Sequence, residues 1–167
     1  KASFLGENPV RVAWDHLGHS RFGRRAFSWL IGHLAPYTGT LGARVEAVRY
    51  GYARAALDDR HAVRNHLESI HAVALVNLAE MVSGVALSYS LPPRSRAIVT
   101  AIAATYLKKA RGRIVAECRF DPPRSNRPGE TELEVVVRDA SGDVTTRVSA
   151  TWRFGRARST PRATRDG

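Results

Sequence analysis

The sequence contains very little cysteine and has no long apolar run free of polar residues. Its single cysteine, Cys118, cannot form a disulfide within the chain, which favours a reducing compartment. The first residues, KASFLGENPVRVAW, lack the apolar core of a secretory signal. Residues 70–89 are apolar enough to suggest a membrane span, but His71, Asn77 and Glu80 within them make burial in lipid costly. We therefore expect a cytoplasmic protein without a membrane span.

Several motifs of established chemistry are also missing. There is no glycine-rich phosphate loop, no G-x-S-x-G nucleophile elbow and no pair of cysteines for zinc. Cys118 lies in an alternating run over residues 114–118, which is typical of a small core residue rather than a catalytic thiol. The residues closest to a metal cluster show no established ligand spacing: Asp58, Asp59, His61 and His66. We expect no metal site.

Acidic residues are scarce, 15 against 26 lysines and arginines, which gives a formal net charge of +11. This excess favours an anionic partner, which is a nucleic acid, a membrane surface or a phosphorylated small molecule. Nucleic acid is disfavoured because the expected strands show no run of aromatic residues interleaved with basic ones. The 167 residues suffice for one domain with one hydrophobic core.

The first part of the chain predicts an amphipathic helix over residues 21–35, which Pro36 and Gly39 end. We expect its apolar face to pack against the domain; a lid over a pocket and a membrane-surface contact are alternatives. That face consists of Phe22, Ala26, Trp29, Leu30 and His33, beside Arg21, Arg24 and Arg25.

From residue 43 the hydrophobic pattern predicts a hairpin over 43–57, a polar loop over 58–65 and a long helix from about 67 to 89. Strands follow over 97–107, 114–120, 133–137 and 144–152, with short connections that favour antiparallel pairing. Between residues 72 and 87 only Asn77, Glu80 and Ser83 are polar, so protein must surround the helix. We predict an α+β fold, a curved antiparallel sheet of about six strands wrapped round one long central helix.

The segment before and along that helix resembles a known family. Asn65 lies six residues before His71, and Glu80 lies nine residues after it. These spacings, with the runs LVNLAEMVSGVAL and IVTAIAATYLKKARG, resemble the PaaI-like acyl-CoA thioesterases of the hotdog superfamily, in an uncharacterised branch. The resemblance implies a hotdog domain over 38–154, after an N-terminal helical extension over 1–37. Residues 155–167 lack an apolar period and are expected to be a disordered basic tail.

The resemblance implies hydrolysis of an acyl-CoA thioester in a dimer or a dimer of dimers, with coenzyme A present only as part of the substrate. Nine helical residues span about 13.5 Å and half a rotation, so one subunit cannot bring both His71 and Glu80 to one thioester. Glu80 of the partner subunit would act as general base or nucleophile, and the amide of Ala72 would bind the oxyanion. Asn65 would orient water or the carbonyl, and His71 would hold the loop. The expected coenzyme A phosphate contacts are Arg94, Arg96, Lys108, Lys109 and Arg111.

Structural alternatives apply to each of these residues. Asn65 and Glu68 match an N-x-x-E capping box, which would make Asn65 the N-cap of the helix. Glu80 could belong to a buried ion pair, His71 could be a hydrogen-bonded structural residue, and each basic residue could be a solvated surface group. The family usually has Gly-Gly where Ala72 and Val73 follow the histidine. This departure supports an alternative function, a non-catalytic acyl or acyl-CoA binding protein on the same fold.

Overall fold

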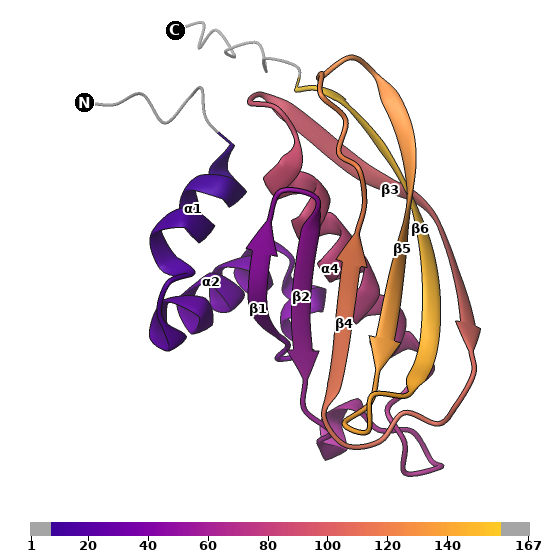
Figure 1. Cartoon of the computed structure of the whole chain (residues 1–167). Coiled ribbons are helices and arrows are strands. Elements are labelled where there is room, and N and C mark those ends of the chain that lie inside the picture. The colour runs from indigo at the N-terminus through magenta and orange to yellow at the C-terminus, as the bar shows by residue number, and fades with distance from the viewer. Residues whose placement is uncertain (1–7, 158–167) are drawn as a thin grey trace, which may run out of the picture.

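A computed structural model describes residues 8–157 of the chain (Figure 1). Residues 1–7 and 158–167 lie outside the described residues, and with them most of the expected basic tail. The helices are α1 (Pro9–Leu17), α2 (Arg21–Leu34), α3 (Pro36–Gly39) and α4 (Ala72–Ser90), with a short 3-10 turn at His61–Val63. The strands are β1 (Arg44–Arg49), β2 (Tyr52–Leu57), β3 (Ser95–Tyr106), β4 (Ile114–Arg119), β5 (Gly129–Arg138) and β6 (Val144–Arg156).

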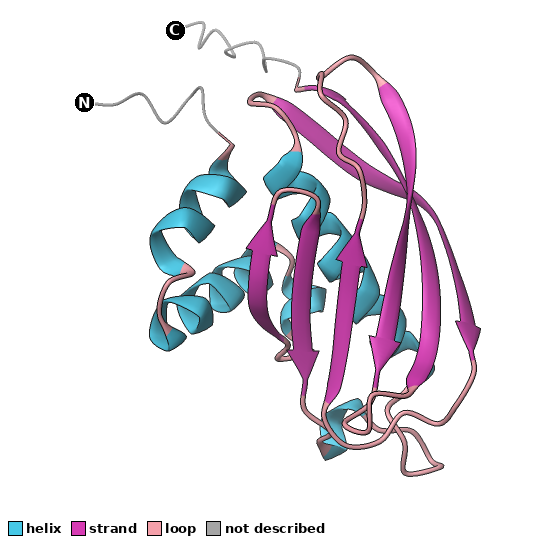
Figure 2. Cartoon of the chain, viewed as in Figure 1, coloured by secondary structure: helices cyan, strands magenta, loops and turns pink. Residues whose placement is uncertain are grey.

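The six strands form one antiparallel sheet that curves round α4 (Figures 1 and 2). Their order is β1-β2-β4-β5-β6-β3, so β4 lies between the two hairpins and β3 crosses to the far edge. This arrangement confirms the predicted hotdog fold. Helices α1 and α2 lie beside the β1 end of the sheet (Figure 1).

The core lies between α4 and the concave face of the sheet. Alternate residues of the central strands are fully buried, among them Ala116 and Cys118 on β4 and Val135 on β5. They face Leu78 and Val82 of α4, and a fully buried leucine or valine side chain contributes about 1.5–3 kcal/mol. Burial raises the pKa of the Cys118 thiol to about 12, so the thiol stays protonated at neutral pH. Cys118 is therefore a core residue, as predicted.

The buried polar residues of α4 have partners within the chain. The indole Nε1–H of Trp152 donates to Ser83 Oγ at 3.1 Å, and the hydroxyl of Thr38 donates to Asn77 Oδ1 at 3.0 Å. A Cβ atom at Gly84 would lie 3.0 Å from the Trp152 ring, so glycine allows this close approach. Within residues 8–157, α4 is the one helix long and apolar enough to cross a membrane, and its apolar residues form the core.

The predicted burial of helix α2 is wrong, although the helix itself is confirmed. Phe22 is 83% exposed and Trp29 is 68% exposed, whereas Phe27 on another face is fully buried. The Phe27 ring meets the Trp14 ring of α1 edge to face, with 5.0 Å between the ring centroids. Apolar residues lie on more than one face of α2, and α1, which the sequence analysis does not predict, determines which face is buried.

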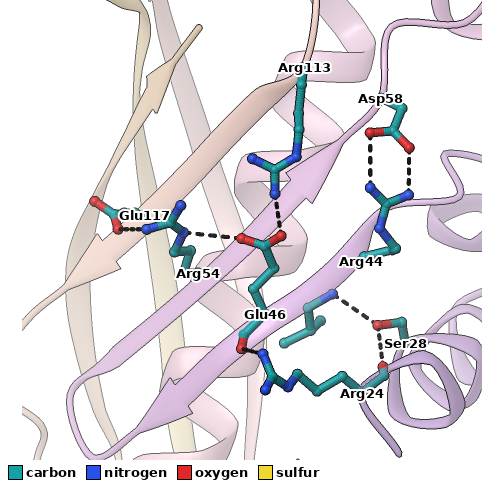
Figure 3. A network of polar contacts seen from close by, with 9 residues as sticks. Arg24, Ser28, Arg44, Glu46, Arg54, Asp58, Arg113 and Glu117 are labelled. Carbon is teal, nitrogen blue, oxygen red and sulfur yellow. Dashed lines mark hydrogen bonds and ion pairs between the residues drawn. The ribbon is translucent and has the colours of Figure 1, made fainter. Parts of the chain in front are cut away.

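Helix α2 is attached along the free side of strand β1 (Figure 3). The Val45 amide donates to Ser28 Oγ at 2.9 Å, and Arg24 Nη1 donates to the Glu46 carbonyl at 3.3 Å. These contacts satisfy backbone groups that an edge strand otherwise leaves unpaired. Strand β3, at the opposite edge, pairs only with β6 in the described part of the chain.

Candidate active site

Helix α4 begins at Ala72, about five residues later than predicted, and His71 is its N-cap. The ring Nδ1 of His71 accepts from the Val73 amide at 3.1 Å, and the His71 amide donates to the Val63 carbonyl at 2.8 Å. The capping box of Asn65 and Glu68 is therefore a wrong prediction. Glu68 has a positive φ of 53° and Ile70 forms a bridge with Arg64, which keeps this segment out of the helix.

Asn65 instead organises the loop before α4. Its Oδ1 accepts from the Leu67 amide at 2.9 Å and from the amide and hydroxyl of Ser69 at 3.3 and 3.2 Å. The oxygen is therefore fully used, while the Nδ2 group has no hydrogen-bond acceptor among residues 8–157. The NH2 group is the part of Asn65 that a ligand can engage.

A pocket of about 340 Å³ lies beside the start of α4, lined in part by Asn65, Ala72, Tyr106, Lys108 and Lys109. The Ala72 amide belongs to the first turn and has no acceptor within the described residues. The positive end of the helix dipole strengthens its attraction for a negatively charged oxygen. The structure thus brings together two of the predicted catalytic residues and supplies two free donors. We call this the donor pocket.

Tyr106 is a pocket residue that the sequence analysis missed. Its hydroxyl donates to the Ala72 carbonyl at 3.2 Å, which joins the end of β3 to the start of α4. The signal available in the sequence is an aromatic residue at the end of a strand, directly before Leu107, Lys108 and Lys109.

His71 lies on the other side of the helix start. It lines a separate cavity of about 490 Å³, together with Tyr37, Val73 and Asn77. The structure therefore does not place His71 with Asn65 in the donor pocket. Its ring caps the first turn of α4, and the role of holding the loop stays a prediction.

Glu80 is half-buried on α4, in line with the partly exposed Val73 and Val76. Nine residues of helix separate it from His71, which corresponds to about 13.5 Å along the axis. No ion-pair partner for its carboxylate exists among residues 8–157. The alternative of a buried ion pair for Glu80 therefore finds no support within the described chain. Within one subunit, Glu80 does not line the donor pocket.

The predicted phosphate contacts fall into two groups at the two ends of β3, about 36 Å apart within one chain. Arg94 and Arg96 line a small cavity of about 180 Å³ near the start of α1. At the other end, Lys108 Nζ donates to Asp139 and Asp143, and these carboxylates raise the pKa of Lys108.

The remaining two basic residues differ in their contacts. Arg111 donates to the carbonyls of Leu67 and Glu68 at 3.2 and 3.3 Å, so it holds the loop that carries Asn65. Lys109 has no hydrogen-bond or ion-pair partner among residues 8–157. It lines the donor pocket and is the residue of this group that a phosphate can engage directly.

The acidic residues near His61 and His66 form ion pairs with arginines. Asp58 accepts two hydrogen bonds from Arg44, and Asp59 accepts from Arg64 at 2.6 Å, which lowers the pKa of both carboxyl groups. Within residues 8–157 no group of three histidine, cysteine or acidic side chains could hold a metal ion.

The fold is the hotdog fold, which this chain shares with proteins described as thioesterases. The family model described as "Domain of unknown function (DUF4442)" matches residues 23–154, and the chain belongs to that family. The comparison with curated proteins found no match.

Solved structures support the fold. A genomics protein designated APC5556 shares 27% identity over 89% of this chain and 98% of its own, with a TM-score of 0.76. A protein of unknown function from Pseudomonas aeruginosa, described as a probable thioesterase, shares 25% identity over 77% and 93% of the two chains, with a TM-score of 0.69. A thioesterase from Haemophilus influenzae has a TM-score of 0.72 at 17% identity over 87% and 99%.

Proposed function

We propose that the protein hydrolyses acyl-CoA thioesters at a site shared between two subunits. The observation that carries this proposal is the donor pocket, where the Ala72 amide and the Asn65 NH2 group lack partners within the described chain. A carboxylate without an ion pair among the described residues, Glu80, lies half-buried on the same helix. The likeness to hotdog proteins described as thioesterases supports the reaction class.

In the proposed reaction the thioester carbonyl oxygen accepts hydrogen bonds from Ala72 and Asn65. One such donor contributes about 3–4 kcal/mol to the stabilisation of the oxyanion. Glu80 of the partner subunit takes a proton from water, and the water oxygen attacks the carbonyl carbon. The carbon–sulfur bond then breaks, and the thiolate receives the proton from Glu80, which leaves a carboxylic acid and free coenzyme A.

The edge of β3 supports the proposed dimer. This strand has twelve residues and no second partner strand in the described chain, and Ile98 on it is 65% exposed. Antiparallel pairing of two such edges continues the sheet across a two-fold axis. It also places the Arg96 end of one strand beside the Lys109 end of the other, so both predicted phosphate groups flank one site.

The test is the variant Glu80→Gln, which keeps size and polarity and removes the charge. We expect turnover of acyl-CoA to fall by roughly 10²–10⁴ while the melting temperature stays unchanged, because Glu80 has no ion partner in the described chain. Glu134→Gln, on the surface of β5 and paired with Arg147, is the control with the same change in charge and should retain wild-type turnover. Normal turnover of Glu80→Gln would contradict the proposed mechanism.

The second candidate, a non-catalytic acyl-CoA binding protein, is favoured by the residues at the helix start. Val73 is 50% exposed beside His71, and its side chain fills space that a glycine leaves open. A panel of acyl-CoAs of different chain length separates the two functions. Binding of an acyl-CoA by the wild-type protein without turnover of any member would establish the second.

A further inference from the structure

Another hollow, of about 730 Å³, lies between α2, β1 and Arg113, which directly precedes β4, and it is separate from the donor pocket. Five arginines and a single carboxylate line it together with Phe22 and Val45 (Figure 3 labels four of these charged residues): Arg21, Arg24, Arg25, Arg44, Arg113 and Glu46. We call it the arginine pocket. None of the residues assigned to thioester hydrolysis lines it.

The carboxylates near this pocket already have partners. Glu46 accepts from Arg54 and Arg113, and Asp58 accepts two hydrogen bonds from Arg44 (Figure 3). Arg21 and Arg25, in contrast, have no acceptor among residues 8–157.

Arg24 is only partly satisfied. Its Nη1 donates to the Glu46 carbonyl, but its Nε is buried and has no hydrogen-bond partner in the described chain. A buried donor without a partner is unfavourable unless a ligand or water supplies the acceptor. The arginine pocket thus keeps positive charge that the described chain does not neutralise.

The position of these arginines on α2 is itself unfavourable. Arg21, Arg24 and Arg25 lie at spacings of three and four residues in the first turns, where like charges repel across the helix surface. The same end carries the positive pole of the helix dipole, and the first turn contains no acidic residue. Of these three arginines, Arg24 is the one that donates a hydrogen bond to β1 in the described chain. The attachment of α2 therefore does not account for the other two, and a bound anion would offset the repulsion among all three.

A wider hollow of about 800 Å³ adjoins the arginine pocket and shares Arg25 and Arg44 with it. Trp29 lies there, 68% exposed and stacked on His33 with 5.2 Å between the ring centroids. Met81, the neighbour of Glu80 on α4, also lines this wider hollow. A ligand with an anionic end and a planar or apolar body matches this sequence of surfaces.

We propose that the arginine pocket binds the phosphate groups of an organic phosphate whose planar or apolar body lies against Trp29. Two sources have this chemistry. One is the nucleotide end of coenzyme A, whose phosphates would then contact these arginines instead of Lys109, and this source rests on the proposed function. The other is a free nucleotide, which does not depend on it.

The test uses calorimetric titration of the full chain with adenosine 3′,5′-bisphosphate, coenzyme A and pantetheine. The variants are Arg21→Gln and Arg25→Gln, because neither side chain makes a hydrogen bond that the fold needs. We expect each to weaken binding of the bisphosphate about tenfold to a hundredfold, as for loss of a charge-assisted hydrogen bond. Arg124→Gln, in the exposed loop before β5, is the control with the same change in net charge. Melting temperatures confirm that the variants fold.

Turnover assays then distinguish the two sources. If coenzyme A is the ligand, Arg25→Gln raises KM for an acyl-CoA and leaves KM for the acyl-pantetheine unchanged. If a free nucleotide is the ligand, the bisphosphate binds and both KM values stay unchanged. A protein without thioesterase activity that still binds the bisphosphate through Arg25 would refute only the proposed function.

Two results would overturn the inference itself. One is binding of neither the bisphosphate nor coenzyme A, or binding that Arg21→Gln and Arg25→Gln do not weaken. The other is association of these arginines with vesicles of phosphatidylserine alone, in the absence of binding to either soluble phosphate. The second result would assign the exposed face of α2 to a membrane surface.

Discussion

At the scale of single residues, some polar groups of α4 and of the loop before it have hydrogen-bond partners within the described chain, and others have none. Asn77 and Ser83 have hydrogen-bond partners in the fold. Asn65 is divided, with its oxygen used by the loop and its NH2 group without a partner in the described chain. This division allows the structural role of Asn65 to be separated from its proposed chemical role.

Two variants of Asn65 make that separation. Asn65→Asp keeps an oxygen that accepts from Leu67 and Ser69 but removes the NH2 donor, so stability should be retained while turnover falls roughly 10²–10³-fold. Asn65→Ala removes both functions, and leaving these donors unsatisfied should also cost about 1–3 kcal/mol of stability. Denaturant unfolding and turnover, measured on the same preparations, check this. Equal turnover of Asn65→Asp and wild type would remove Asn65 from the mechanism.

At the scale of elements, the sequence predicts the strands well because their pattern depends on local alternation. Leu133, Val135 and Val137 show the period of two that one buried face produces. The start of α4 is less predictable, because apolar residues such as Leu67 and Ile70 continue the helical pattern into the loop. The loop depends on contacts with distant backbone, such as the Ile70 amide with the Ala110 carbonyl at 2.8 Å.

The same distinction explains which parts of the site were predictable. Asn65 and Ala72 lie together as expected, because a short loop connects them. His71 faces the other cavity, since the path of the loop is determined by its bond to Val63 and not by spacing alone. The buried face of α2 depends on the packing of Phe27 against Trp14, a contact across two helices that a single helical pattern does not contain.

Asp59 couples two loops near the donor pocket and makes stability depend on pH. Its carboxylate accepts from Arg64 and from the Gly112 amide at 2.8 Å, and these bonds lower the pKa of Asp59 in the fold. A lowered folded-state pKa adds stability that is present above the unfolded pKa of about 3.9 and is lost as the pH falls through the folded value. We expect Asp59→Asn to lower the melting temperature at pH 7. The difference from wild type should shrink below about pH 4, and a difference independent of pH would contradict this assignment.

At the scale of the whole molecule, the proposed site requires two copies of the chain. Light scattering after size exclusion should give at least twice the chain mass of 18.4 kDa. Ile98→Lys with Ile102→Lys places charge on the exposed edge strand and should shift the protein to the monomer with loss of turnover. Circular dichroism checks that the variant stays folded. A fully active monomer would contradict the shared site.

The attachment of α2 along β1 has a further consequence for how the sheet can grow. A sheet with two open edges can add neighbours without limit, which is the geometry of fibrils. Here the contacts of Ser28 and Arg24 occupy backbone groups of one edge, so among residues 8–157 β3 is the edge that remains available for another strand. Pairing of two β3 edges uses both open ends at once, and the assembly terminates. In the proposed dimer, helix α2 thereby limits strand addition to a single pairing and prevents polymerisation.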